Sequence, residues 1–154
     1  TLFRSPHVID ENHLVEIIRK LKRPYVRYTR ADEKNVRKAD CLIIDCFGLL
    51  SSIYRYGEIA YIGGGFGVGI HNTLEAAVYG IPVIFGPKYQ KFQEAIHLLE
   101  AKGGFSIKSY EELKILLDRM LGDEDFLREA GKNAGAYVTD NAGTTDKVLG
   151  MINF

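Results

Sequence analysis

The sequence predicts an α/β fold: a Rossmann-like, mostly parallel sheet with helices on both faces. Short apolar runs, such as "DCLIID" (40–45) and "PVIFG" (82–86), alternate with longer segments of helical periodicity. A continuous apolar run of this length is typical of a strand that is buried on both faces. Because parallel strands need a crossover, the intervening helices are expected to cover the sheet.

The first third of the chain predicts two strands and a helix after an initial strand end. "TLFRSPHV" is expected to finish a strand and enter a loop at Pro6. Asp10 or Asn12 then caps a helix to about Leu21, because apolar residues recur there at helical spacing. Strands are expected over 25–29 and 40–45, and a helix over 48–56.

The remaining elements continue the alternation of strands and helices. Gly80 and the pair at 103–104 are stop signals for helices, and Ser109 is a helix cap. The pattern predicts strands over 59–63, 82–86 and 104–107, and helices over 72–79, 90–102, 110–121 and 123–138, with a last helix from about 144.

Composition predicts one soluble domain over 1–154. Twenty basic residues balance twenty acidic ones, which argues against a broad nucleic-acid interface. No apolar run reaches the roughly 18 residues of a membrane span. Cys41 and Cys46 are five apart, so they are poor disulfide partners on one strand, and reduced thiols fit a cytosolic setting. No histidine spacing indicates a metal site.

The most unusual stretch is "YIGGGFGVGIHNTLEAAVYGIP" (61–82), where glycines precede a helical pattern. Neither GxGxxG nor a Walker loop fits it, because Val68, Ile70 and His71 stand at required positions. Bare backbone at Gly64 and Gly65 is able to approach an anion closely, and the helix expected from Asn72 would present N–H groups to a phosphate.

Asn72 and Glu75 support two interpretations of the same spacing. Asn72-x-x-Glu75 fits a capping box that only stabilises the helix start. Alternatively, Asn72 reaches a phosphate while the Glu75 carboxylate accepts hydrogen bonds from ribose hydroxyls. The spacing alone leaves both open.

Three segments together resemble the C-terminal half of the bacterial 3-deoxy-D-manno-octulosonic acid (Kdo) transferases, which are GT-B glycosyltransferases. "SPH" (5–7) stands where the family has a Pro-Arg or Pro-His pair. "DCFGLLSSIYRYGEIAYIGGGF" (45–66) is similar to its Asp-x-x-Gly-Glu-Leu helix, strand and Gly-Gly-Ser. "HNTLEAAVYGIPVIFGPKYQKFQEA" (71–95) is similar to its His-Asn-x-Leu-Glu segment, Gly-x-Pro-Val strand and Gly-Pro.

The resemblance implies a site for a cytidine-monophosphate-activated sugar. Carried over by position, it implicates nine residues in binding CMP, to which the physical interpretation of the glycine stretch adds Gly64 and Gly65. The nine are Pro6, His7, Phe47, Gly48, Leu49, Asn72, Thr73, Leu74 and Glu75. Lys88 is a further, weaker candidate.

Two positions depart from the family pattern. Leu49 stands where the family has an acidic residue, so any contact from that carboxylate is lost or made by main chain. The stretch between Gly65 and His71 is one residue shorter and lacks the family's arginine.

The resemblance implies an enzyme that transfers Kdo from CMP-Kdo to the lipid A precursor in lipopolysaccharide biosynthesis, at the cytoplasmic face of the inner membrane. It implies no catalytic residue in this chain, because the general base comes from an N-terminal acceptor domain that we expect to be absent here. No cofactor or metal is expected either. The fragment alone is then expected to be soluble and inactive. Two alternatives stay open: a GT-B transferase or epimerase that uses a UDP-sugar, and a non-enzymatic Rossmann-like module.

Overall fold

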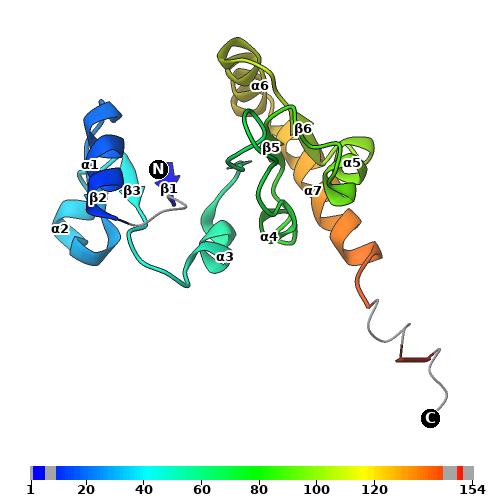
Figure 1. Cartoon of the computed structure of the whole chain (residues 1–154), viewed down its shortest axis with the longest axis horizontal. Helices are drawn as coiled ribbons and strands as arrows, with labels where there is room; N and C mark the ends of the chain where they lie inside the picture. The colour runs from blue at the N-terminus through cyan, green and yellow to red at the C-terminus, as the bar shows by residue number, and fades with distance from the viewer. Residues whose placement is uncertain (1, 6–9, 144–148, 151–154) are drawn as a thin grey trace. The chain divides into compact units, whose positions relative to one another are not determined.

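The computed structural model describes residues 2–5, 10–143 and 149–150. The chain divides into two compact units, Thr1–Ile53 and Tyr54–Phe154 (Figure 1). Each unit contains a three-stranded parallel sheet and helices. The predicted α/β class with parallel strands is therefore confirmed, with the strands divided between two small sheets. The single domain over 1–154 stays a prediction.

The sheet of the first unit has the order β1-β3-β2. Its strands are β1 (Leu2–Arg4), β2 (Tyr25–Arg27) and the central β3 (Cys41–Ile43). Helix α1 (Glu11–Lys20) connects β1 to β2 and begins at Asp10, whose carboxylate accepts the His13 N–H at 3.0 Å. Leu14 and Ile17 of α1 pack on Cys41 and Ile43. The predicted helix and its apolar face are confirmed.

Two predicted elements of this unit are shorter in the structure. The strand expected over 25–29 ends at Arg27, because the Thr29 N–H donates to Asp45 and a 3₁₀ helix, η1 (Tyr28–Arg30), follows. A short helix α2 (Glu33–Val36) then leads to β3. The helix expected over 48–56 becomes α3 (Leu50–Ile53) and the 3₁₀ helix η2 (Tyr54–Tyr56), since Gly48 has a left-handed φ of +84°.

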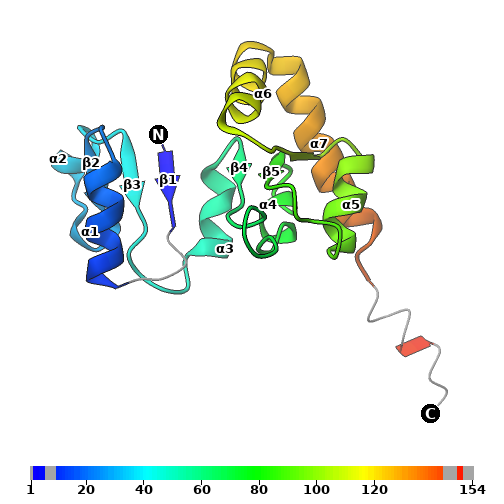
Figure 2. The ribbon, with the colours of Figure 1, turned by 45° about the horizontal axis from the view of Figure 1, so that its top comes forward.

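The second unit has the sheet order β4-β5-β6, and β4 and β5 lie next to each other in Figure 2. The strands are β4 (Ala60–Tyr61), β5 (Val83–Phe85) and β6 (Gly104–Ser106). All three residues of the central β5 are fully buried. They contribute to different cores: Val83 and Phe85 cluster with α4 (Leu74–Ala77), α5 (Gln93–Glu100) and α7 (Glu124–Asp140), whereas Ile84 clusters with α6 (Tyr110–Gly122). Helices therefore cover both faces of this sheet, as predicted.

Capping residues set several helix ends in this unit. Ser109 accepts the Glu112 N–H at 3.2 Å and starts α6, which confirms the predicted cap. Gly80 follows α4 with a left-handed φ of +70°. Helix α4 is only one turn long, shorter than the predicted 72–79. The start predicted at about 144 for a last helix lies outside the described residues.

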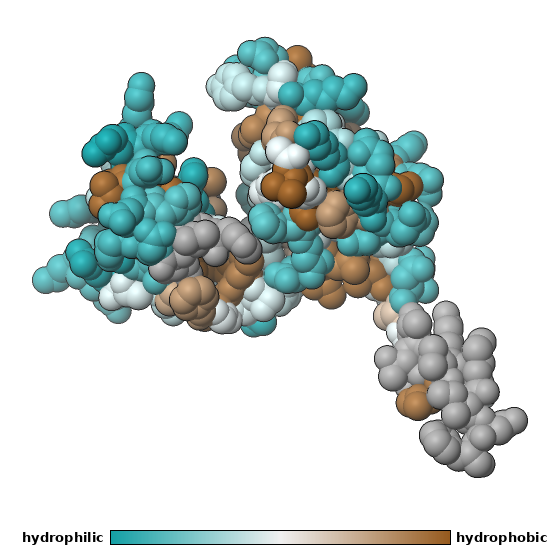
Figure 3. Space-filling model, viewed as in Figure 1, coloured by the Kyte–Doolittle hydropathy of each residue, from teal (hydrophilic) through white to brown (hydrophobic). Residues whose placement is uncertain are grey.

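The surface of the described residues is mixed. Hydrophilic side chains cover much of the visible face of each unit, with apolar patches among them (Figure 3). Among the described helices, none combines the length and apolarity needed to cross a lipid bilayer. Cys41 and Cys46 are both free thiols, and burial raises the pKa of Cys41.

Candidate functional site

The predicted nucleotide-binding residues fall in both units. In the first unit, Phe47, Gly48 and Leu49 belong to the loop after β3, and Pro6 and His7 come after β1 in the sequence. In the second unit they follow β4. Pro6 and His7 lie outside the described residues, so their predicted contacts stay predictions.

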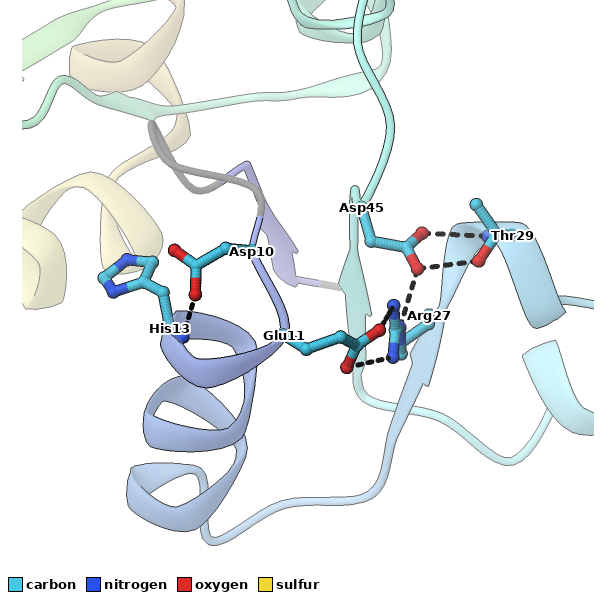
Figure 4. Close-up of polar contacts among 6 residues, drawn as sticks. All are labelled: Asp10, Glu11, His13, Arg27, Thr29 and Asp45. Carbon is cyan, nitrogen blue, oxygen red and sulfur yellow. Dashed lines mark hydrogen bonds and ion pairs between the residues drawn. The ribbon is translucent and has the colours of Figure 1, made fainter.

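A buried carboxylate anchors the loop after β3. The side chain of Asp45 is completely buried and accepts three hydrogen bonds (Figure 4). The donors are Arg27 Nε at 2.6 Å, Thr29 N at 2.9 Å and Thr29 Oγ1 at 2.7 Å. Burial alone would raise the pKa of Asp45, but the hydrogen bonds from Thr29 and Arg27 outweigh it and lower the pKa to about 2. Asp45 is therefore ionised and held in one orientation.

Arg27 extends this cluster to the start of α1. Its guanidinium donates to both carboxylate oxygens of Glu11, at 3.1 and 2.8 Å, while its Nε binds Asp45. The Arg27 side chain is 15% exposed, whereas that of Glu11 is 68% exposed. Hydrogen bonds to Glu11 and then to Asp45 raise the pKa of Arg27, so this residue is a permanent cation.

The predicted residues Phe47, Gly48 and Leu49 follow directly after this anchor. Gly48 needs its left-handed φ, and no atom lies within 4 Å of where a Cβ would stand. Phe47 is 80% exposed, and the Leu49 carbonyl accepts hydrogen bonds from Ser52 at the start of α3. A leucine side chain at 49 offers no polar contact, so the departure from the family pattern has a chemical consequence here. The contacts of all three residues to a nucleotide stay predictions.

The glycine stretch of the second unit forms a tight loop that packs on other backbone. Gly64 and Ile70 form an antiparallel bridge, and the Gly65 N–H donates to the carbonyls of Val68 and Gly69. A Cβ on Gly65 would lie 2.8 Å from the Cα of Gly86. Both Gly64 and Gly65 have left-handed φ values. Glycine is therefore required here by internal packing, and the predicted anion contact has to come from N–H groups other than that of Gly65.

Asn72 and Glu75 are paired, but not in the predicted capping box. Asn72 Nδ2 donates to Glu75 Oε1 at 3.1 Å, and Asn72 Oδ1 accepts the Leu74 N–H at 3.0 Å. The helix cap is Thr73, whose side chain makes no capping bond. A capping box would instead join the Asn72 side chain to the N–H of Glu75. The Asn72 amide thus holds the carboxylate at the helix start, where Glu75 stays partly exposed.

Thr73 and Leu74 complete this group. Thr73 is fully buried, and its hydroxyl has no hydrogen-bond partner among the described residues. A buried, unpaired hydroxyl costs about 1–3 kcal/mol. A nucleotide contact from Thr73 stays a prediction and requires this hydroxyl to become accessible. Leu74 is 36% exposed and its N–H is already bonded to Asn72.

Lys88 belongs to the glycine loop rather than standing apart from it. Its Nζ donates to the Gly67 carbonyl at 2.9 Å, and its N–H donates to the Gly65 carbonyl at 2.9 Å. The Lys88 ammonium therefore places a positive charge beside the loop that follows β4.

Sequence reasoning missed Arg27 and Thr29 and gave Asp45 no role beyond a family motif. A signal was present in the sequence: an acidic residue ends the apolar run 41–44, and a basic residue ends the strand before it. Strand ends of a parallel sheet meet at one edge, so such residues are candidates for pairing. The partner could not be named, because several arginines and lysines lie nearby in the sequence.

No protein-family model matches the chain. The 3-deoxy-D-manno-octulosonic acid transferase of Aquifex aeolicus is 41% identical over 86 residues, which are 54% of this chain and 24% of that protein. The enzyme of the same name from Rickettsia bellii is 34% identical over 116 residues, 73% of this chain and 28% of that protein. The chain thus spans about a quarter of the length of these relatives, and its resemblance to Kdo transferases is confirmed.

A solved structure is similar to the chain as well. The C-terminal CMP-Kdo binding domain of WaaA from Acinetobacter baumannii superposes with a TM-score of 0.61 at 20% identity, over 79% of this chain and 66% of that domain. At this identity the likeness concerns the fold. It confirms the predicted fold, that of the C-terminal half of a GT-B glycosyltransferase.

Proposed function

Because the chain is homologous to part of the Kdo transferases, we propose that it is the donor-binding part of a glycosyltransferase that uses CMP-Kdo. The observation that carries the proposal is the 41% identity over 86 residues to the Aquifex aeolicus enzyme. The full-length protein then moves Kdo to the lipid A precursor at the cytoplasmic face of the inner membrane. The general base that activates the acceptor hydroxyl belongs to a part of the protein beyond this chain.

The pair Asn72–Glu75 supports this proposal chemically. A carboxylate with two oxygens is an acceptor for a vicinal diol. The Asn72 amide donates one hydrogen bond to Glu75 Oε1. Glu75 Oε2 is left to accept a ribose hydroxyl in this proposal. A carboxylate that is already oriented loses less side-chain entropy when the ribose binds.

The reaction breaks the bond between the anomeric carbon of Kdo and the CMP phosphate, while the acceptor oxygen bonds to that carbon. Negative charge develops on the leaving phosphate, which becomes part of CMP. Backbone N–H groups of the loop after β4 and the Lys88 ammonium are the groups of this chain proposed to stabilise that charge. The one-turn helix α4 has only a small dipole, so individual donors supply this stabilisation rather than the helix as a whole.

Calorimetric titration of the 154-residue chain with CMP, UMP and UDP tests the proposal. We expect CMP to bind most tightly. A clear preference for UDP would instead support a transferase or epimerase that uses a UDP-sugar. Binding of none of the three would support a non-enzymatic module.

The variant Glu75→Ala tests the proposed ribose acceptor. We expect CMP binding to weaken by about 1–3 kcal/mol, because a ribose hydroxyl loses its partner. Glu58→Ala is the matched control, since it removes an exposed carboxylate from the same unit. Lower stability of the Glu75 variant with unchanged CMP affinity would favour the purely structural role of the Asn72–Glu75 pair.

A further inference from the structure

We propose that Arg27 is a positioning residue for nucleotide binding, which fixes the loop after β3 relative to the start of α1. This inference rests on the proposed function, because the loop after β3 carries predicted CMP contacts. The side-chain hydrogen bonds of Arg27 go to Asp45 and Glu11, and neither of these is a predicted nucleotide contact. Its effect on binding has to be transmitted through Asp45 and Glu11.

The topology of the first unit places the three charged residues at one edge of its sheet. Arg27 is the last residue of β2 and pairs with Ile43, the last residue of β3. Asp45 follows β3 by two residues, and Glu11 is the first residue of α1, which follows β1. Because the strands are parallel, these positions share the carboxyl edge where ligands bind in open α/β sheets.

The guanidinium is suited to hold both partners at once. Nε binds the fully buried Asp45, and the two terminal nitrogens bind Glu11 in a bidentate pair (Figure 4). A lysine has a single charged nitrogen and lacks this fixed fork. The planar guanidinium of Arg27 therefore fixes the distance between Asp45 and the first turn of α1.

The burial of Asp45 shows how this cluster acts on the loop. Its side chain is completely buried, so Asp45 cannot contact a nucleotide directly in this conformation. Its carboxylate also holds the backbone of Thr29, which ties η1 to the same point. Because the loop is fixed at Asp45, the residues that follow it, 46–49, begin from a defined position. Residues that contact a ligand are held precisely only when contacts behind them fix their backbone.

Glu11→Gln is the decisive variant, because it separates positioning from folding. The Glu11 side chain is 68% exposed, so its loss leaves the Asp45 pair and the core intact. We expect CMP affinity to fall about threefold, within the range of an exposed ion pair, with an unchanged melting temperature. Glu16→Gln, another exposed glutamate of α1, is the control and should bind CMP as the wild type does.

Arg27→Gln should weaken CMP binding by about tenfold or more, as outer contacts of a site commonly do. Arg27→Lys should recover only part of this loss. Hydrogen exchange of the amides at 46–49 should accelerate in Arg27→Gln, whether or not CMP is present.

Each outcome is decisive. Unchanged CMP affinity in Glu11→Gln and in a folded Arg27→Gln, with binding by the wild type, would overturn the positioning role alone. Unchanged exchange at 46–49 in Arg27→Gln would overturn it independently of any ligand. Absence of CMP binding by the wild-type chain would overturn the proposed function instead. If Arg27→Gln does not fold, Glu11→Gln with its control decides the question.

Discussion

Replacing Asp45 with Asn should destabilise the first unit in a pH-dependent manner. The variant keeps the shape of the side chain but puts an amide where three donors converge on a carboxylate. The pKa of Asp45 falls from an ordinary 3.8 to about 2. At 1.36 kcal/mol per pKa unit, this difference is worth about 2 kcal/mol at pH 7. Arg27, which is only 15% exposed, also loses one of its two anionic partners and keeps only Glu11, so the total cost should be about 2–4 kcal/mol.

The direction of the pH dependence follows from the lowered pKa. The folded carboxyl binds a proton less readily than the unfolded one, so its contribution to stability is complete above about pH 5. It is lost as the pH falls through the folded pKa of about 2. The difference in unfolding free energy between wild type and Asp45→Asn should therefore shrink progressively over that interval.

The assay has to report on the first unit, because two compact units are able to unfold separately. Hydrogen exchange at the β3 amides, combined with urea unfolding followed by circular dichroism, meets this need. Thr29→Val, which removes one of the three hydrogen bonds, should cost about 1 kcal/mol. A stability loss below about 0.5 kcal/mol for Asp45→Asn at pH 7, or a loss that is equal at pH 7 and pH 3, would refute the reasoning.

Three further substitutions test the second unit through its unfolding free energy. Gly65→Ala should lower the unfolding free energy by about 2 kcal/mol or more, because alanine would have a left-handed φ and a Cβ 2.8 Å from the Gly86 Cα. An unchanged stability would contradict this close packing. Gly122→Ala, in the last turn of α6 with open space around it, should instead stabilise by about 0.5–1 kcal/mol. Ser109→Ala should cost about 1 kcal/mol and increase exchange of the Glu112 amide, which loses its acceptor.

Most of the fold was predictable from local pattern. The predicted strand at 82–86 and the helices after Ser109 and near 123 match β5, α6 and α7, because apolar periodicity and caps both act over a few residues. The shorter elements differ for reasons beyond local pattern. Strand β2 stops at Arg27 because Asp45, eighteen residues later, takes the Thr29 N–H. No property of 25–29 alone contains that information.

The candidate site was predictable in outline but not in its hydrogen bonds. The spacing of Asn72 and Glu75 predicted that they share a helix face, and they do contact each other. The bond goes from side chain to side chain, however, since Thr73 caps the helix and Asn72 turns toward the Leu74 N–H. The glycines also have a packing role that the local pattern did not predict, because the proximity of Gly65 to Gly86 depends on two loops meeting in space. Their contact with CMP stays a prediction.

The contact between Gly65 and Gly86 has a consequence for the thermodynamics of ligand binding. The Gly65 carbonyl accepts the Lys88 N–H, and the backbones at 65 and 86 touch, so the loops that follow β4 and β5 form one body. A ligand at this edge would meet backbone that is already ordered. We therefore expect the heat-capacity change of binding to depend on the apolar surface of the ligand alone. It should lack the large negative contribution of a segment that folds when the ligand binds.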